Sequence, residues 1–245
     1  MTEIQREIPY WMSRTAMLFD EQGIRNLMQK NILVVGLGGV GGICAEMIAR
    51  AGVGKMTIVD VDVVEASNRN RQIAALSSTE NILKAEIMAA RLRDINPEIN
   101  LTLLPEYLKD ERMVDVLKSE PFDYVVDCID TLTPKTYLIK HSLDLGLKII
   151  SSMGAGGKMD PSKIQIADVS KSYNCKLAYY TRKRLHRHGI RSGFKVVFST
   201  EQADPTKVLI AESGPKKAII GTVSYMPAIF GCFLASEVIR DLAKS

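Results

Sequence analysis

The strongest signal in this sequence comes from residues 32–42, which read ILVVGLGGVGG. Four apolar residues lead directly into Gly36, Gly38 and Gly41, whose spacing is G-x-G-x-x-G. This pattern predicts a buried strand that ends in a tight turn and continues into a helix. Glycines let the backbone of such a turn approach a phosphate, and the helix N-terminus favours negative charge there. The motif therefore predicts a nucleotide site, for either a hydride-transferring dinucleotide or ATP.

The composition is that of a globular protein. The chain has 245 residues, of which 46% are apolar and 24% charged, and its formal net charge is +4. A chain of this length can bury a large core without disulfides or metals. Residues 1–11 carry charges throughout and do not resemble a signal peptide. The longest weakly polar run, residues 218–235, contains Pro227 and two glycines, so we expect a buried strand or loop and a core helix rather than a membrane span.

The cysteines predict no zinc site. Cys44, Cys128, Cys175 and Cys232 form no C-x-x-C pair, which zinc sites of the common structural type contain. Cys44 and Cys128 lie in apolar segments and are expected in the core. Cys175 has polar neighbours, and we interpret it as an ordinary cysteine near the surface rather than a covalent catalyst. Reduced thiols are typical of the cytoplasm, which is the predicted location.

Predicted strands and helices alternate over the first 150 residues. Residues 14–29 have apolar positions at near-helical spacing around Gly23, which predicts one broken helix or two short ones. Strands are expected at residues 31–36, 55–60, 100–105, 122–130 and 148–152, and helices at residues 40–51, 82–96, 111–119 and 134–146. This alternation predicts an α/β fold with a doubly wound, mostly parallel, Rossmann-like sheet and helices on both faces.

The pattern changes after residue 157. Residues 163–169, 194–200 and 207–212 have the pattern of strands, and residues 176–189 predict a very basic helix. We therefore expect the C-terminal part to extend the same sheet with antiparallel strands and a helix. No linker is evident, so a single domain is predicted. It comprises an N-terminal helical segment (1–30), a nucleotide-binding core (31–157) and a sheet extension with the basic segment (158–245).

Charged residues after the second strand favour ATP over NAD. Asp60 follows Gly41 by 19 residues, where a carboxylate accepts hydrogen bonds from the ribose of either nucleotide. Asn68, Arg71 and Lys84 come next along the chain. Hydride transfer needs few cations at this place. Attack of a carboxylate on the α-phosphate of ATP, in contrast, needs cations that neutralise the departing pyrophosphate.

A magnesium ligand is expected at the same edge of the sheet. Asp130 ends the segment DCID at the carboxyl end of the fourth strand, and ligands bind at the carboxyl ends of the strands in such folds. Mg²⁺ is commonly held by one or two carboxylates together with substrate phosphates. Each charged residue alone fits a solvated surface, but together they favour an ATP site. A plain NAD-binding module is the alternative that they disfavour.

The chain resembles the E1-like adenylating enzymes of the ThiF/MoeB type. The resemblance rests on SRTAMLF, GLGGVG, VDVDVVEASNRNRQ, LKAE, INPE and DCID, and it covers nearly the whole chain. It implies one adenylation domain that binds ATP and Mg²⁺ and forms a homodimer. The nucleotide-binding residues that it implies are Gly36, Gly38, Gly39, Gly41, Asp60, Asp62, Asn68, Arg71 and Lys84. The catalytic residues that it implies are Arg14, Arg71, Lys84 and Asp130, with Asp130 supporting Mg²⁺ and Arg14 reaching the phosphates of the other protomer.

Three further segments indicate one branch of this family. MGAGGKMDPSKIQIADVSKS, VVFSTE and SGPKK resemble the tRNA threonylcarbamoyladenosine dehydratases. The resemblance implies that ATP activates the carboxylate of N6-threonylcarbamoyladenosine at position 37 of tRNA, with release of pyrophosphate. A group within the same modification then attacks, and AMP leaves as a five-membered ring closes. An intramolecular nucleophile needs no enzyme thiol, which agrees with the interpretation of Cys175.

Adenylation of a ubiquitin-like sulfur carrier protein, of the ThiS/MoaD type, is the second hypothesis. Such a carrier needs a channel for its Gly-Gly tail and usually a thiol that receives sulfur. Enzymes that load these carriers often have two C-x-x-C zinc pairs, and this chain has none. Relatives associate with cysteine desulfurase systems, so a sulfur-acceptor partner stays open. A monovalent cation in the GAGG turn stays open as well.

A basic segment is the expected contact with tRNA. Between Lys171 and Lys195 there are eight Lys or Arg residues and no Asp or Glu, with tyrosines interleaved. Clustered cations bind phosphates, and aromatic side chains stack on exposed bases. A charge run alone is usually a solvated helix face, but the resemblance to the dehydratases favours tRNA. The residues assigned to this contact are Arg182, Lys183, Arg184 and Arg187.

Overall fold

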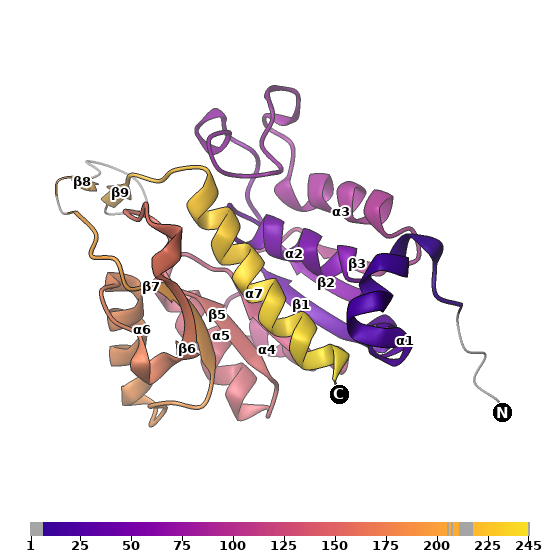
Figure 1. Ribbon diagram of the computed structural model, residues 1–245. Coiled ribbons are helices and arrows are strands. Elements are labelled where there is room, and N and C mark those ends of the chain that lie inside the picture. The colour runs from indigo at the N-terminus through magenta and orange to yellow at the C-terminus, as the bar shows by residue number, and fades with distance from the viewer. Residues whose placement is uncertain (1–6, 205, 207, 211–217, 245) are drawn as a thin grey trace.

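A seven-stranded sheet forms the centre of the computed structural model, which describes residues 7–204, 206, 208–210 and 218–244 (Figure 1). The strands lie in the order β3-β2-β1-β4-β5-β7-β6. Their bounds are β1 (Asn31–Val35), β2 (Lys55–Val59), β3 (Asn100–Leu104), β4 (Tyr124–Asp127), β5 (Ile149–Ser152), β6 (Ile164–Asp168) and β7 (Lys195–Ser199). Neighbouring strands are parallel from β3 to β7, and β6 pairs antiparallel with β7 at the edge. The predicted mostly parallel sheet is therefore confirmed.

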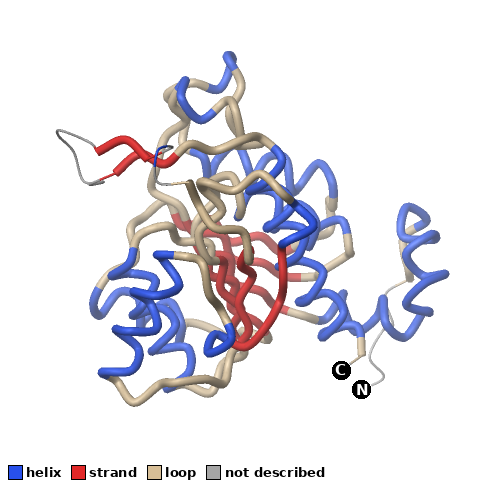
Figure 2. Tube along the Cα trace, turned by 60° about the vertical axis from the view of Figure 1, so that its left-hand side comes forward, coloured by secondary structure: helices blue, strands red, loops and turns tan. Residues whose placement is uncertain are grey.

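Helices cover both faces of this sheet (Figures 1 and 2). One face holds α1 (Ser13–Gln29), α2 (Gly41–Arg50), α3 (Lys84–Ile95) and α7 (Tyr225–Ala243), and the other holds α4 (Asp110–Lys118), α5 (Leu132–Asp144) and α6 (Lys176–Arg187). Successive residues of β1 alternate between the two cores, with Ile32 and Val34 facing the first group and Leu33 and Val35 the second. Burial on both faces explains why β1 is continuously apolar.

The C-terminal helix α7 lies across α2 on one face of the sheet (Figure 1). A Cβ atom at Gly231 of α7 would lie only 2.5 Å from the carbonyl oxygen of Val40, so only glycine permits this close approach. The core helix predicted for this weakly polar run is thus confirmed. Among the helices that the structure describes, none has both the length and the apolar character needed to cross a membrane.

The N-terminal helix α1 is broken, as expected, and the break lies at Asp20. This residue has φ 57° and ψ 176°, outside the helical range. Its carboxylate accepts a hydrogen bond of 2.8 Å from the backbone N–H of Gly23, in the manner of an N-cap. The side chain of Asp20 therefore begins the second half of α1.

Residues 208–210, the described part of the strand expected at residues 207–212, do not extend the main sheet, which corrects the expectation for them. The short strands β8 (Val208–Ile210) and β9 (Ala218–Ile220) pair antiparallel with each other in a separate sheet. Pairing with a neighbour in the chain costs less loop-closure entropy than pairing with a distant strand. β7 runs parallel to β5 and antiparallel to β6, so the expected antiparallel extension of the sheet is confirmed for β6 and β7. The segment SGPKK, residues 213–217, lies outside the described residues.

Candidate nucleotide and tRNA site

The glycine turn follows β1 at the point where the order of the strands reverses, between β1 and β4. Gly36 has φ +93°, and a Cβ atom at Gly41 would lie 1.7 Å from the carbonyl oxygen of Gly36. Glycine is therefore required at both positions for α2 to begin here. A Cβ atom at Gly38 would meet nothing closer than the Gln72 side chain at 3.8 Å. This leaves room beside Gly38 for a ligand, while Gly39 packs closely against Pro227.

Asp60 is tied to the glycine turn. Its Oδ2 accepts a hydrogen bond of 2.6 Å from the N–H of Leu37, and its Oδ1 accepts one of 2.8 Å from the N–H of Asp62. Burial raises the pKa of Asp60 above its ordinary value, although these two hydrogen bonds and the charge of Lys84 oppose the shift. A carboxylate oxygen has a second lone pair, so Asp60 can also accept hydrogen bonds from ribose hydroxyls.

Lys84 and Asp62 form an ion pair beside the turn. Lys84 is the first residue of α3 and only 5% exposed, and its Nζ lies 2.9 Å from Oδ2 of Asp62. The backbone N–H of Lys84 also donates to the carbonyl oxygen of Asp62. A cation at the positive end of a helix is electrostatically unfavourable. Local conflicts of this kind are expected at functional or strained sites.

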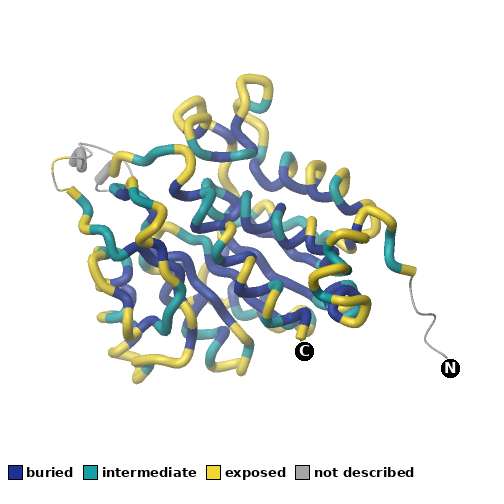
Figure 3. Tube along the Cα trace, in the orientation of Figure 1, coloured by how far each residue is buried: buried dark blue, intermediate teal, exposed yellow. Residues whose placement is uncertain are grey.

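Asn68 and Arg71 lie in the exposed loop between β2 and α3, residues 60–83, which projects from the molecule (Figure 3). Asn68 is buried, and its Oδ1 accepts a hydrogen bond of 3.2 Å from the N–H of Glu65. The guanidinium of Arg71 donates to the carbonyl oxygen of Ser67 at 3.0 Å and to Oδ1 of Asn70 at 2.8 Å. It pairs with no carboxylate among the described residues, so its charge is available to a phosphate.

The end of β4 touches the glycine turn. A Cβ atom at Gly36 would lie 2.9 Å from the carbonyl oxygen of Cys128, which precedes the exposed Asp130 by two residues. In the described ranges, no group of three or more His, Cys, Asp or Glu side chains is arranged to hold a metal ion. Asp130 therefore fits Mg²⁺ only if the phosphate oxygens of a nucleotide supply further ligands, which is the arrangement that Mg²⁺ prefers.

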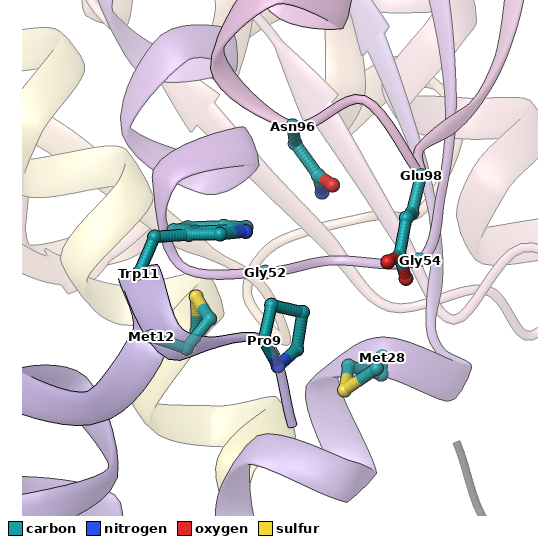
Figure 4. A pocket seen from close by; sticks show the side chains of 8 residues that line it. All are labelled: Pro9, Trp11, Met12, Met28, Gly52, Gly54, Asn96 and Glu98. Atoms are coloured by element: carbon teal, nitrogen blue, oxygen red, sulfur yellow. The ribbon is translucent and has the colours of Figure 1, made fainter. Parts of the chain in front are cut away.

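Arg14 lies away from this group of residues. The chain just before it packs on the other end of α2, where a Cβ atom at Gly52 would lie 2.6 Å from Cε of Met12. The ten residues of α2 correspond to about 15 Å of helix between this end and the glycine turn. Figure 4 shows the small hollow beside Met12. It is lined by Pro9, Trp11, Met12, Met28, Gly52, Gly54, Asn96 and Glu98, and contains none of the predicted nucleotide-binding residues.

The basic helix α6 packs against α5 near Asp130. Nη1 of Arg184 donates a hydrogen bond of 2.7 Å to Oγ1 of Thr133, which is three residues beyond Asp130. Arg182 is half-buried and donates to Oγ of Ser172. The contact between Arg184 and Thr133 places the last turn of the basic helix beside the edge of the sheet that carries Asp130.

The outer face of α6 is cationic and aromatic. Lys183 and Arg187 are exposed, and none of the four basic residues assigned to tRNA pairs with a carboxylate in the part of the chain that the structure describes. Tyr179 and Tyr180 are about half exposed, with ring centroids 5.2 Å apart. This combination of free cations and accessible rings suits phosphates and unstacked bases.

Sequence reasoning missed Lys135, which is among the largest completely buried side chains of the described residues. A signal was available, because Lys135, Leu138, Ile139 and Ser142 share the spacing of one helical face, and all four are buried. A lysine on the core-facing side of an amphipathic helix requires a partner inside the protein. The partner is Asp127, at the end of β4.

Comparison with known proteins identifies the family. The model of the ThiF family matches residues 12–245. The chain belongs to the ThiF family. It is 35% identical to the tRNA threonylcarbamoyladenosine dehydratase of Bacillus subtilis (strain 168), and 34% identical to the protein of that name of Escherichia coli (strain K12). Each comparison covers 95% of this chain and 94% of the relative.

A solved structure in the ThiF family matches the whole fold. The crystal structure of the E. coli tRNA N6-threonylcarbamoyladenosine dehydratase in complex with ATP superposes with a TM-score of 0.86. The sequences are 33% identical, and the match covers 95% of this chain and 93% of that chain. The predicted membership of this family and the Rossmann-like fold are thereby confirmed.

Proposed function

We propose that this chain is an ATP-dependent tRNA threonylcarbamoyladenosine dehydratase. One observation carries the proposal: the basic, tyrosine-bearing helix α6 contacts α5 beside the sheet edge that holds the nucleotide-binding residues. A tRNA bound along α6 would thus lie next to the ATP site. The names of the B. subtilis and E. coli relatives, each matched over 95% of this chain, support the same substrate.

The residues of the site suit adenylation of a carboxylate. The amides of the glycine turn would hold phosphates at the start of α2, and Asp60 would bind the ribose. The carboxylate oxygen of the modified nucleoside would attack the α-phosphorus as the bond to the β-phosphate breaks. Arg71 and Lys84 would stabilise the charge that develops on the pyrophosphate, and Asn68 would face the same phosphates. AMP would then leave when a group of the same modification closes the ring.

Magnesium is part of this proposal. Asp130, with phosphate oxygens, would hold Mg²⁺ at the carboxyl end of β4. The ion would supply charge neutralisation to the phosphates. The position of Asp130 beside the glycine turn supports this assignment.

Dimerisation would complete the site with Arg14. The exposed segment around Arg14 carries apolar side chains, with Tyr10 92%, Met17 87% and Leu18 84% exposed. Such a group of exposed apolar residues is typical of a protein interface. Because Arg14 lies at the far end of α2 in its own chain, we propose that it acts in the site of a second copy.

The remaining expectations stay predictions. All 245 residues would act as one adenylation domain, since α1 and α7 pack together on one face. A tRNA substrate suits the cytoplasm, and a cysteine desulfurase or sulfur-acceptor partner stays a prediction. So does a monovalent cation at the GAGG turn, residues 154–157. There the ammonium of Lys158 already donates to the carbonyl oxygens of Asn174 and Glu201, so an ion would need other ligands.

Formation of AMP tests the proposal. The purified protein is incubated with ATP and Mg²⁺, and with either tRNA that carries the modification, unmodified tRNA or a ubiquitin-like sulfur carrier. We expect AMP and pyrophosphate only with the modified tRNA. AMP formation that depends on the carrier protein, and not on tRNA, would overturn the proposal in favour of the sulfur-carrier hypothesis.

A further inference from the structure

Lys135 is the centre of a closed polar network in the core. Its Nζ lies 2.6 Å from Oδ2 of Asp127, 3.1 Å from Oγ of Ser151 and 2.9 Å from the carbonyl oxygen of Ser152. The side chains of Lys135 and Asp127 are both completely buried. An ammonium has three donors, so every donor of Lys135 is used.

The carboxylate of Asp127 is equally well satisfied. Its Oδ2 also accepts a hydrogen bond of 2.5 Å from Oγ of Ser151, and its Oδ1 accepts one of 3.0 Å from the backbone N–H of Ile129. A buried ion pair seldom stabilises a fold more than apolar side chains of the same size would. Folding stability alone therefore gives little reason for a lysine and an aspartate at these positions.

The network lies directly behind the candidate site. Ile129, whose N–H is held by Asp127, immediately precedes Asp130. Lys135 is the fourth residue of α5, and Thr133, the acceptor for Arg184 of the basic helix, is the second. The same ammonium thus connects β4, β5 and α5 at the point where the Asp130 segment enters α5.

We propose that Lys135 is a positioning residue: through Asp127 it fixes the segment that carries Asp130 relative to the basic helix. This inference rests on the proposed function, because it assumes that Asp130 acts on ATP. Lys135 itself has no access to a ligand, since its side chain is completely buried. Displacement of catalytic groups by about 1 Å can lower a rate about 10²-fold.

The decisive variant carries Lys135→Met and Asp127→Asn together. This pair removes both charges and leaves no uncompensated ion in the core. We expect kcat to fall about 10²-fold, while the KM for ATP changes less than about threefold, because the glycine turn and Asp60 are untouched. The Mg²⁺ concentration for half-maximal rate should rise, and the backbone amides of residues 128–131 should exchange with deuterium faster than in the wild type.

A second variant and a control complete the test. Ser151→Ala removes one bridging hydroxyl and should fold even if the double variant does not; we expect a smaller loss of kcat with the same shift in Mg²⁺ dependence. Glu46→Gln with Arg91→Met removes an ion pair between α2 and α3, and should lower thermal stability without lowering kcat.

Two results would overturn the inference. One is a folded variant at Lys135 or Ser151 whose kcat and Mg²⁺ dependence equal those of the wild type. The other is unchanged amide exchange at residues 128–131 in those variants. Failure of the proposed function is a different outcome, since it would show as absent turnover by the wild-type protein. Deuterium exchange of the amides of residues 128–131 would still decide whether Lys135 fixes the segment that carries Asp130.

Discussion

The ammonium of Lys84 lies 2.9 Å from the carboxylate of Asp62, yet the side chain of Lys84 is 6% exposed and that of Asp62 65%. The cation is therefore fixed inside the protein, while its partner faces solvent. A phosphate that enters from the solvent side can compete with Asp62 for Lys84 without any movement of the helix. This arrangement suits a cation that is preorganised for an anionic ligand.

Replacing Lys84 with methionine tests this role. Methionine keeps most of the buried apolar stem, and Asp62 stays in water, so we expect the protein to remain folded. The rate of AMP formation should fall about 10²–10³-fold, as for the loss of one preorganised donor. The matched control is Lys55→Met, which breaks the ion pair with Glu120 at the opposite end of β2. A wild-type rate in Lys84→Met would contradict the assignment.

Hybrid dimers test the origin of Arg14. Arg14→Ala and Lys84→Ala should each be nearly inactive alone. Mixed in equal amounts and allowed to exchange subunits, half of the dimers would contain one copy of each, with one intact site, so about a quarter of the wild-type activity should return. Sedimentation analysis of the same mixture measures the fraction of the protein that is dimeric. An active monomer, or no recovery of activity after proven exchange, would show that Arg14 does not act across an interface.

The exposed cations of α6 should bind the tRNA backbone. We choose Lys183→Glu with Arg187→Glu, because Arg182 and Arg184 also hold neighbouring hydroxyls. The affinity for tRNA should fall, and the slope of log affinity against log salt should become shallower by about two units if each residue neutralises one phosphate. Binding of ATP should not change. Arg93→Glu with Lys118→Glu, on α3 and α4, makes the same change of net charge elsewhere. If tRNA affinity depends on salt concentration in the same way for the two double variants, α6 is only a solvated face.

Glu46 should make the free energy of unfolding depend on pH in the acidic range. Burial by itself raises the pKa of Glu46, but hydrogen bonds from Arg91 at 2.6 Å and Arg50 at 2.8 Å outweigh burial and hold the pKa below the ordinary value for glutamate. The stabilisation is therefore present above the unfolded pKa and is lost as the pH falls through the folded value. Glu46→Gln should lower the free energy of unfolding by about 1–2 kcal/mol at neutral pH, since Arg91 is partly exposed. Urea unfolding at a pH well below the folded pKa of Glu46 should show no difference between variant and wild type. A constant difference at all pH values would contradict this account.

The repeating units of the fold could be predicted from the sequence because each carries a local signal. β1 is continuously apolar, and the glycine turn and the start of α2 require glycine at Gly36 and Gly41, where a side chain would be strained or would clash. The separate pairing of β8 with β9 could not be predicted, because a short apolar run contains no information about its partner. The same holds for β7, whose parallel pairing with β5 depends on tertiary packing.

The candidate site was predictable to a similar degree. Asp60 and Lys84 could be named from their places after the strands, but their connections to Leu37 and Asp62 could not. The contact between Arg184 and Thr133 joins residues 51 positions apart, and no sequence pattern indicates it. Lys135 was overlooked because charged side chains are ordinarily assigned to the surface, whereas here an aspartate of the neighbouring strand balances the charge.

Stoichiometry of the reaction on tRNA tests the central claim most directly. Modified tRNA is incubated with the protein, ATP and Mg²⁺, then digested to nucleosides, and the loss of N6-threonylcarbamoyladenosine is compared with the AMP formed. The account predicts one nucleoside lighter by one water molecule for each AMP released, with no reaction when ATP is replaced by NAD. An unchanged nucleoside in the presence of bound ATP, or dehydration without AMP formation, would contradict it.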